Sequence, residues 1–413
     1  MLTEDSLQNF RQIMVTAINP TICILGCLAN IFNMIIFTRK HMRSSTNIYL
    51  TALAFADFFY LFFSLSELFN YQRFSHFYVA IYFYSYGTIV WLKEAFSYIS
   101  ISITVSFTIE RYIAVRYPIH RQRYCTETIA KRVIIALFLF CILGTIAKPF
   151  EFKFVHKTKG YNSKTGNYCD QELACLETSQ PERIELARNI NDTSTTTKFI
   201  CNDAENNRTF ELNQNDVENC KKIDYYKTEE TDLRFNTTYV QIYSIVVTII
   251  FVLIPLIVLI VFNSLLIHIV HEASKLREKL TQVPISRSDS GLKKNANEIK
   301  TISQENKITI VLISIVVVFL LCQIPWAIYV IFLYFTNILS SELAYFLAII
   351  LNTLVDINSA INLILYCGLS EDYRKTSKKL LRELTFRASS TASSSSNKQK
   401  SMSTLADHTI YTS

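Results

Sequence analysis

The sequence predicts an all-α membrane protein, a bundle of seven transmembrane helices followed by a short amphipathic eighth helix. Half of the 413 residues are hydrophobic, and glycine and proline number only seven each. Apolar runs of about twenty residues recur, which is the length of helix that crosses the hydrocarbon of a bilayer. Strands would have to close into a barrel to cross it, and the period-two alternation of such strands is absent. The seven apolar runs are 15–38, 47–69, 84–110, 130–150, 239–267, 307–335 and 343–367.

The segments between these runs alternate in charge. One set holds 25 Lys+Arg against 10 Asp+Glu, a net of +15, and the other holds 14 against 19, a net of −5. Because basic segments stay in the cytoplasm, we expect a plasma-membrane protein with its N-terminus outside the cell and its C-terminus inside. The basic set is 39–44, 111–132, 272–307 and 368–413, and the other set is 1–14, 70–86, 151–238 and 336–342.

The longest connecting segment, 151–238, is predicted to be the second extracellular loop. It is polar and acidic, and it contains the three N-x-S/T sequons of the chain, which suits a glycosylated loop on the outer side. Four cysteines in an extracellular loop suggest two disulfides in one of three pairings, with free thiols as the alternative. The sequons begin at Asn191, Asn207 and Asn236, and the cysteines are Cys169, Cys175, Cys201 and Cys220.

The other soluble segments are short or biased in composition. The extracellular segment 1–14 is too short to fold alone, and no cleavable signal is visible before the bundle, 15–367. The third intracellular loop, 268–306, is polar. Residues 368–385 predict an amphipathic helix on the inner leaflet, with Lys and Arg facing anionic lipid. The tail 386–413 is rich in serine and is expected to be disordered.

Ionisable residues within the apolar runs are the candidate functional residues, because a charge in a bilayer is costly unless it is paired. Arg111 ends one run, and its neighbour Glu110 can be its partner. Asp57 lies in mid-span and must be paired, protonated or bound to a cation. Lys93 precedes Arg111 by eighteen residues, which places it about 27 Å farther along the helix. This pattern indicates a membrane switch rather than an enzyme.

A group of charges toward the outer ends of the helices predicts a ligand pocket. Pairing Lys93 with Asp356 would leave a net charge near −2, which favours a cationic ligand. Two aromatic residues beyond Pro325 add surface for cation–π contact. A salt-bridge network that only orients the helices is the alternative. The candidate ligand-binding residues are Glu67, Lys93, Glu94, Trp326, Tyr329 and Asp356.

Three motifs carry a family resemblance. ERYIAV begins at Glu110, TNIYLTALAFAD ends in Asp57, and NSAINLILY ends in Tyr366, while Asn30 provides a polar residue in the first span. With these motifs the chain resembles the rhodopsin-like G-protein-coupled receptors over about 16–385. The resemblance implies a receptor that activates heterotrimeric G proteins, without enzymatic activity. It also makes receptor kinase and arrestin candidate partners of the tail, with a flexible spacer as the alternative.

The resemblance implies a sodium site around Asp57. Oxygen ligands suit a hard cation, and the family places such residues around its buried acid. A hydrogen-bonded cluster without an ion is the alternative. No other cofactor and no nucleic-acid partner is implied. The residues of this pocket are Asp57, Ser100, Asn358, Ser359 and Asn362.

The resemblance also implies an activation switch. Arg111 would be locked to Glu305 at rest, and the sixth helix would swing about Pro325 when the lock breaks. Glu305 could instead be a solvated acid in the first turn of a helix. The exposed knob that meets the G-protein α subunit would be Ile119. The switch residues are Glu110, Arg111, Tyr112, Glu305, Ile101, Pro255, Phe319, Pro325 and Tyr366.

Three further stretches, SSTNIYLTALAFAD, KPFEF and FLLCQIP, resemble invertebrate FMRFamide-type neuropeptide receptors. Such receptors bind peptides that end in Arg-Phe-amide, so Glu67 or Glu94 would pair with the arginine of the ligand. A serpentine chemoreceptor for another ligand on the same fold is the nearer alternative. A membrane transporter is the more distant one.

The chain departs from the family pattern at several positions. The cysteine that usually ties the third helix to the second outer loop is replaced by Tyr86, so we expect the loop to be tethered less firmly. Gln323 replaces the usual tryptophan of the sixth helix, Leu363 the proline of the seventh, and Asn263 the tyrosine of the fifth. We therefore expect details of activation to differ from the family.

Overall fold

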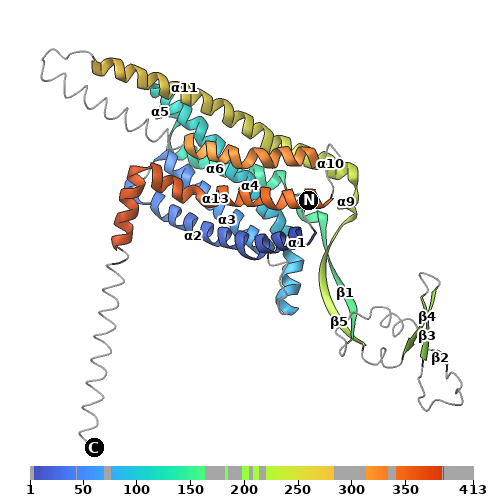
Figure 1. The fold of residues 1–413 in the computed structure, drawn as a ribbon. Helices are drawn as coiled ribbons and strands as arrows, with labels where there is room; N and C mark the ends of the chain where they lie inside the picture. The colour runs from blue at the N-terminus through green and yellow to red at the C-terminus, as the bar shows by residue number, and fades with distance from the viewer. Residues whose placement is uncertain are drawn as a thin grey trace, which may run out of the picture. The chain divides into compact units, whose positions relative to one another are not determined.

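The fold is given by a computed structural model (Figure 1). The chain forms two compact units. The first unit consists of Met1–Gln72, Ile89–Ala147 and Thr237–Ser413, and the second consists of Arg73–Thr88 and Lys148–Asn236. The structure describes residues 4–42, 44–68, 76–162, 182–184, 198–203, 208–213, 220–282, 313–333, 341–383 and 385.

The first unit is a bundle of long helices that lie side by side (Figure 1). Helix α4, His76–Arg116, belongs to this unit from Ile89 onward. A helix at 371–383 follows the bundle, at the place where the sequence predicts an amphipathic helix. The other elements are α1 Glu4–Ile13, η1 Met14–Ile18, α2 Asn19–Phe37, η2 Lys40–Met42, α3 Ser45–Leu68, α5 Pro118–Tyr124, α6 Glu127–Gly144, α10 Thr237–Thr248, η5 Ile249–Leu253, α11 Ile254–Gln282, the helix Ile313–Leu333 and α13 Ser341–Leu369.

Six helical segments among the described residues are long and apolar enough to cross a membrane. Together with α4 they correspond to the seven predicted spans, so the predicted transmembrane helix bundle is confirmed. Helix α4 is less apolar because Lys93, Glu94, Glu110 and Arg111 interrupt it. The six segments are Gln8–Phe37, Ser45–Glu67, Glu127–Glu151, Thr238–Glu272, Ile313–Leu333 and Phe346–Gly368.

The local sequence explains how several of these helices begin or bend. Thr126 caps α6, where its hydroxyl oxygen accepts a hydrogen bond from the Ile129 N–H at 3.3 Å. The π-helical turn η5 precedes Pro255, which lacks the N–H that would bond to the preceding turn of a regular helix. The first helical segment starts at Glu4, well before the predicted span, because α1 continues into α2 through the π-helical turn η1.

Close packing joins α2, α3 and α13 in the core of the first unit. Gly26 of α2 makes this possible, because a Cβ there would lie 2.5 Å from the Leu61 side chain and 2.8 Å from the Cβ of Ala360. Phenylalanines fill the space between α3, α4 and α6, and the rings of Phe59 and Phe96 stack at 5.0 Å. The core is therefore built around the helices that contain the buried polar residues.

The second unit contains the strands of the long loop. Strands β1, Phe152–Asn162, and β5, Cys220–Glu230, pair antiparallel along their whole length, from Phe152 opposite Glu230 to Asn162 opposite Cys220. A separate antiparallel sheet has the order β2-β3-β4. The remaining elements of this unit are η4 Lys148–Glu151, β2 Glu182–Ile184, β3 Lys198–Asp203, β4 Arg208–Asn213 and α9 Asp232–Phe235.

A buried ion pair closes the base of the β1–β5 ribbon. The Glu151 side chain is 1 % exposed, and its Oε2 lies 3.1 Å from Arg234 Nη1 and 3.3 Å from Lys148 Nζ. Thr231 adds hydrogen bonds from its N–H to the Glu151 carbonyl and from its hydroxyl to the Phe150 carbonyl, at 2.9 and 2.8 Å. These contacts bind the segment before β1 to the segment after β5.

Replacing Glu151 by Gln should loosen this ribbon, because Lys148 and Arg234 would lose their buried carboxylate. A fully buried pair costs about 3–5 kcal/mol to break, and the partly exposed cations reduce this to about 2 kcal/mol. That corresponds to roughly a 30-fold increase in the opening equilibrium, measurable as faster amide hydrogen exchange in β1 and β5.

The matched control for this prediction is Glu230→Gln. Glu230 also pairs with Arg234, at 3.6 Å, but its side chain is 47 % exposed, and surface pairs contribute little. Equal exchange rates in the Glu151 and Glu230 variants would contradict the assignment of a special role to the buried carboxylate.

Candidate functional site

The predicted polar cluster around Asp57 is assembled from α3, α4 and α13. Asp57 is 1 % exposed, and both of its carboxylate oxygens accept hydrogen bonds at 2.7 Å, from Ser100 Oγ and from Asn362 Nδ2. The Ser359 side chain also forms a hydrogen bond with this carboxyl group. Asn358, which precedes Ser359 on α13, is buried as well. The cluster therefore brings a carboxylate, hydroxyls and an amide together inside the bundle.

Asn30 links the same cluster to α2. Its Nδ2 donates to the Ser359 carbonyl at 2.9 Å and to the Gly26 carbonyl at 3.0 Å. The oxygen atoms of Asp57, Ser100 and Asn362 are the kind of ligand that a hard cation such as sodium takes, so the residues present fit this ion. If a cation enters, the hydroxyl of Ser100 has to turn its lone pairs toward it.

A second charged cluster joins α3, α4 and α13 farther along the helices. Lys93 Nζ pairs with Glu67 Oε2, and both side chains are partly exposed. This corrects the expected pairing of Lys93 with Asp356. Asp356 is 2 % exposed and accepts a hydrogen bond from Ser64 Oγ at 3.1 Å and another from Tyr60. It lies close enough to Lys93 and Glu67 to interact with their charges.

The other predicted ligand-binding residues have contacts of their own. Glu94 Oε1 accepts a hydrogen bond from the Tyr98 hydroxyl at 2.8 Å. The rings of Trp326 and Tyr329 pack at 5.5 Å, and the Tyr329 hydroxyl donates to the Ala344 carbonyl at 2.9 Å. The role of these three residues in ligand binding stays a prediction.

The predicted switch residues of α4 lie at its carboxyl end. Arg111 Nη2 lies 3.1 Å from Glu110 Oε1, and the same oxygen accepts a hydrogen bond from Ser45 Oγ at 2.6 Å. The Tyr112 ring lies edge-on to Phe262 of α11 at 5.2 Å. Glu305, the predicted partner of Arg111, lies outside the described residues. Ser45 and Glu110 thus hold Arg111 at the point where α3 and α4 meet.

The remaining switch residues are distributed through the core. Ile101 and Phe319 are 2 % and 3 % exposed, whereas Pro255 is half-buried after the π-helical turn. Pro325 lies within the helix 313–333, and Gln323 beside it is buried. The Tyr366 ring packs edge-on against Phe37 at 5.0 Å and tilts against Tyr373 at 5.6 Å. Ile119 is 89 % exposed at the start of α5, as a knob for a partner would be.

The predicted modification sites of the loop are described only in part. Asn236 is exposed between α9 and α10, while Asn191 and Asn207 lie outside the described residues. Cys201 lies in β3 and Cys220 in β5, whereas Cys169 and Cys175 lie outside the described residues. Their pairing and the glycosylation stay predictions.

Tyr86, which replaces the usual cysteine of the third helix, makes a different contact with the loop. Its ring lies edge-on to Phe152, the first residue of β1, with centroids 5.4 Å apart and planes at 89°. Edge-on aromatic pairs contribute about 1 kcal/mol beyond the area that they bury. An aromatic contact therefore connects α4 to β1 at the position where the family has a covalent bond.

Comparison with known proteins decides the family. The family model described as "Serpentine type 7TM GPCR chemoreceptor Srw" matches residues 17–201 and 193–383. The chain belongs to this receptor family. The chain is also similar to receptors of the rhodopsin-like group. This agrees with the resemblance seen in the motifs at Asp57 and Arg111.

Three relatives illustrate this similarity. The receptor is 38% identical to the thyrotropin-releasing hormone receptor of Homo sapiens over 126 residues, 30% of each chain. It is 30% identical to the FMRFamide peptide receptor frpr-18 of Caenorhabditis elegans over 158 residues, 36% of each chain. It is 31% identical to the FMRFamide receptor of Drosophila melanogaster over 173 residues, 40% of this chain and 30% of the relative. The matches span about a third of each relative's length.

Sequence reasoning missed three hydrogen-bond donors of the receptor, Ser45, Ser64 and Tyr98. Each bonds to a carboxylate that the sequence did identify. Tyr98 could have been found, because it follows Glu94 by four residues on one helix face. The two serines lie on a different helix from their partners, and serine in an apolar helix has no distinctive pattern.

Proposed function

We propose that this receptor responds to an extracellular neuropeptide of the RFamide type by activating a heterotrimeric G protein at the plasma membrane. The observation that carries the proposal is the cluster of Glu67, Lys93 and Asp356 among α3, α4 and α13. Intramembrane ionisable residues are functional by default. The similarity to receptors named for FMRFamide in two animals supports the choice of ligand.

The charges of the cluster indicate which carboxylate meets the arginine of the peptide. Lys93 neutralises Glu67, and Asp356 is buried and hydrogen-bonded, so neither is well placed to receive a bulky guanidinium. Glu94 is less buried than Asp356, and its Oε1 accepts a hydrogen bond from the Tyr98 hydroxyl. We therefore assign the arginine to Glu94, with the aromatic rings of Trp326 and Tyr329 near the terminal phenylalanine.

A screen of amidated peptides tests this function. Cells that express the full chain with a promiscuous G protein should give a calcium response to peptides ending in Arg-Phe-amide. Glu94→Lys should abolish the response, and a peptide with glutamate in place of arginine should restore it. A response only to unrelated small molecules would favour a chemoreceptor for another ligand on the same fold.

We also propose that sodium binds at Asp57 and stabilises the resting receptor. Purified receptor should melt a few degrees higher in sodium chloride than in choline chloride, because a ligand that binds only the folded state raises its stability. Asp57→Asn should remove this difference, since the amide cannot neutralise the cation.

The matched control for the sodium prediction is Asp356→Asn, which changes the other buried aspartate of the bundle. It should keep the sodium-dependent difference in melting temperature. A wild-type protein that melts identically in the two salts would rule out the sodium site and leave a purely hydrogen-bonded cluster.

A further inference from the structure

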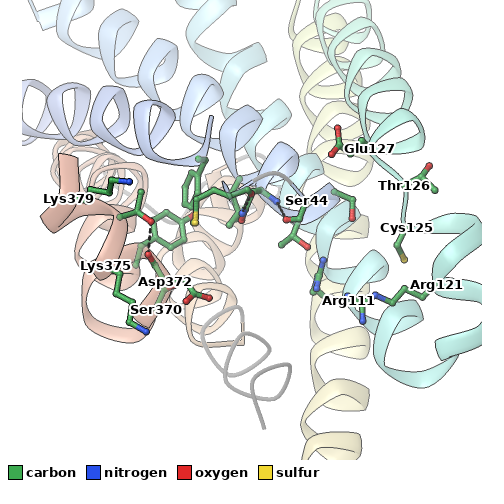
Figure 2. Close-up of a pocket in the computed structure, with 18 residues that line it drawn as sticks. Ser44, Arg111, Arg121, Cys125, Thr126, Glu127, Ser370, Asp372, Lys375 and Lys379 are labelled. Atoms are coloured by element: carbon green, nitrogen blue, oxygen red, sulfur yellow. Dashed lines mark hydrogen bonds between the residues drawn. The ribbon is translucent and has the colours of Figure 1, made fainter. Parts of the chain in front are cut away.

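A cavity of about 980 Å³ opens where α3 begins, next to the carboxyl end of α4 and the helix 371–383. Figure 2 shows Lys375 and Lys379 on one side of it, with Arg111 and Arg121 on the other. The lining carries four cationic side chains against the anionic Glu127 and Asp372. Two of the cations also have partners outside the lining, Lys375 with Glu371 at 2.9 Å and Arg111 with Glu110 at 3.1 Å. A cavity of this size accommodates a drug-sized molecule rather than a single inorganic ion.

Two buried polar groups in the wall of this cavity have no hydrogen-bond partner among the residues that the structure describes. Thr46 is 5 % exposed, and its hydroxyl is unpaired. The Nε of Arg111 is also buried and unpaired, although its Nη2 contacts Glu110. An unpaired buried polar group costs about 1–3 kcal/mol, and such groups in native proteins usually have an explanation. Both residues line the cavity, so an acceptor that displaces the atoms covering these two groups would receive a hydrogen bond from each.

The start of α3 faces the same cavity. Residues Ser44, Ser45, Thr46 and Asn47 all line it, and the Ser44 hydroxyl caps the helix by accepting from the Asn47 N–H at 3.2 Å. The amino end of a 24-residue helix carries a partial positive charge and favours anions. The helix end and the unpaired donors therefore point to the same kind of ligand.

We propose that this cavity binds a small, multiply phosphorylated anion. The hydroxyl of Thr46 and the Nε–H of Arg111 donate to one phosphate near the start of α3. Arg121, Lys375 and Lys379 interact with further phosphates across the cavity. Several phosphates are needed to reach cations that lie on α4, α5 and the helix 371–383. All the residues of this site are among those that the structure describes, and anion binding there does not require the proposed peptide ligand.

This phosphate chemistry has two sources in a cell, a soluble inositol polyphosphate and the head group of a phosphoinositide. The first arm of the test uses inositol hexakisphosphate, titrated against the purified full chain in nanodiscs of uncharged lipid. Saturable binding is expected. Lys379→Gln should weaken it about tenfold, as loss of a charge-assisted hydrogen bond does, and Thr46→Val should weaken it about fivefold.

The matched control is Lys378→Gln. Lys378 is exposed on the same helix and does not line the cavity, so its loss should leave the affinity within about twofold. Equal losses of affinity in the Lys378 and Lys379 variants would show that binding depends on general surface charge, which would overturn the proposal. No saturable binding to the wild type would overturn it as well. If Thr46→Val fails to fold, the comparison of the two lysine variants still tests the proposal.

The second arm distinguishes the sources. The titration is repeated in nanodiscs that contain phosphatidylinositol 4,5-bisphosphate. A weaker affinity of the wild type for inositol hexakisphosphate, with Lys379→Gln unaffected by the lipid, assigns the cavity to the lipid head group. An affinity that the lipid leaves unchanged assigns it to the soluble anion.

Discussion

Exchanging the charges of Lys93 and Glu67 should restore a peptide response that either single reversal weakens. Lys93→Glu would place three carboxylates together at Glu67, Asp356 and the new side chain, and Glu67→Lys would place two cations beside the single carboxylate of Asp356. Breaking one partner of a fully buried pair costs about 3–5 kcal/mol, and the partial exposure of both side chains reduces this to about 2 kcal/mol. Each single variant should therefore raise the half-maximal peptide concentration about 30-fold.

The double variant rebuilds the pair with the charges reversed. We expect its half-maximal concentration to return to within about tenfold of the wild type, since coupled neighbours are strongly non-additive. Surface expression and melting temperature should recover in parallel. If the double variant responds no better than the single ones, Lys93 and Glu67 do not act as a pair.

Glu110→Gln should raise signalling without ligand. The Glu110 carboxylate pairs with Arg111 at 3.1 Å and accepts a hydrogen bond from Ser45 at 2.6 Å, so it fixes the end of α4 to the start of α3. An amide loses the charge attraction. If the resting conformation alone is destabilised by about 2 kcal/mol, the equilibrium between the resting and active conformations shifts about 30-fold toward the active one. The measurement is nucleotide exchange by a G protein in the absence of peptide.

The control for this variant is Glu127→Gln. Glu127 lies in the first turn of α6 near the same cavity but is exposed. Its substitution should leave the basal rate unchanged, and Ser45→Ala should raise it less than Glu110→Gln does. A basal rate in Glu110→Gln equal to that of the wild type would contradict a resting role for this carboxylate.

Much of the fold could be predicted from the sequence because membrane spans are set by length and hydropathy. The ribbon of β1 and β5 was not predicted, although Phe152, Lys153 and Phe154 begin an alternation typical of a strand. The extension of the first helical segment back to Glu4 was missed because its residues are polar and contribute no hydropathy signal. Helix ends are the least predictable part of such proteins.

The residues of a candidate site could be predicted where a sequence motif identifies them. Asp57, Ser100 and Asn362 meet as the family resemblance implied. The partner of Lys93 was not predictable, because Glu67 and Asp356 lie at similar depth and the choice depends on how the helices rotate. The cavity at the start of α3 was missed for a related reason, since Thr46, Arg111 and Lys379 are far apart in sequence and only the fold brings them together.

We expect an amidated peptide whose arginine pairs with Glu94, next to Lys93 of the charged cluster, to drive G-protein activation at the far end of the bundle. The most direct test is GDP release from purified heterotrimers, with the full chain in nanodiscs and the peptide from the screen. We expect the peptide to accelerate release and Lys93→Glu to weaken this acceleration. A release rate that no amidated peptide changes, with any heterotrimer, would contradict it.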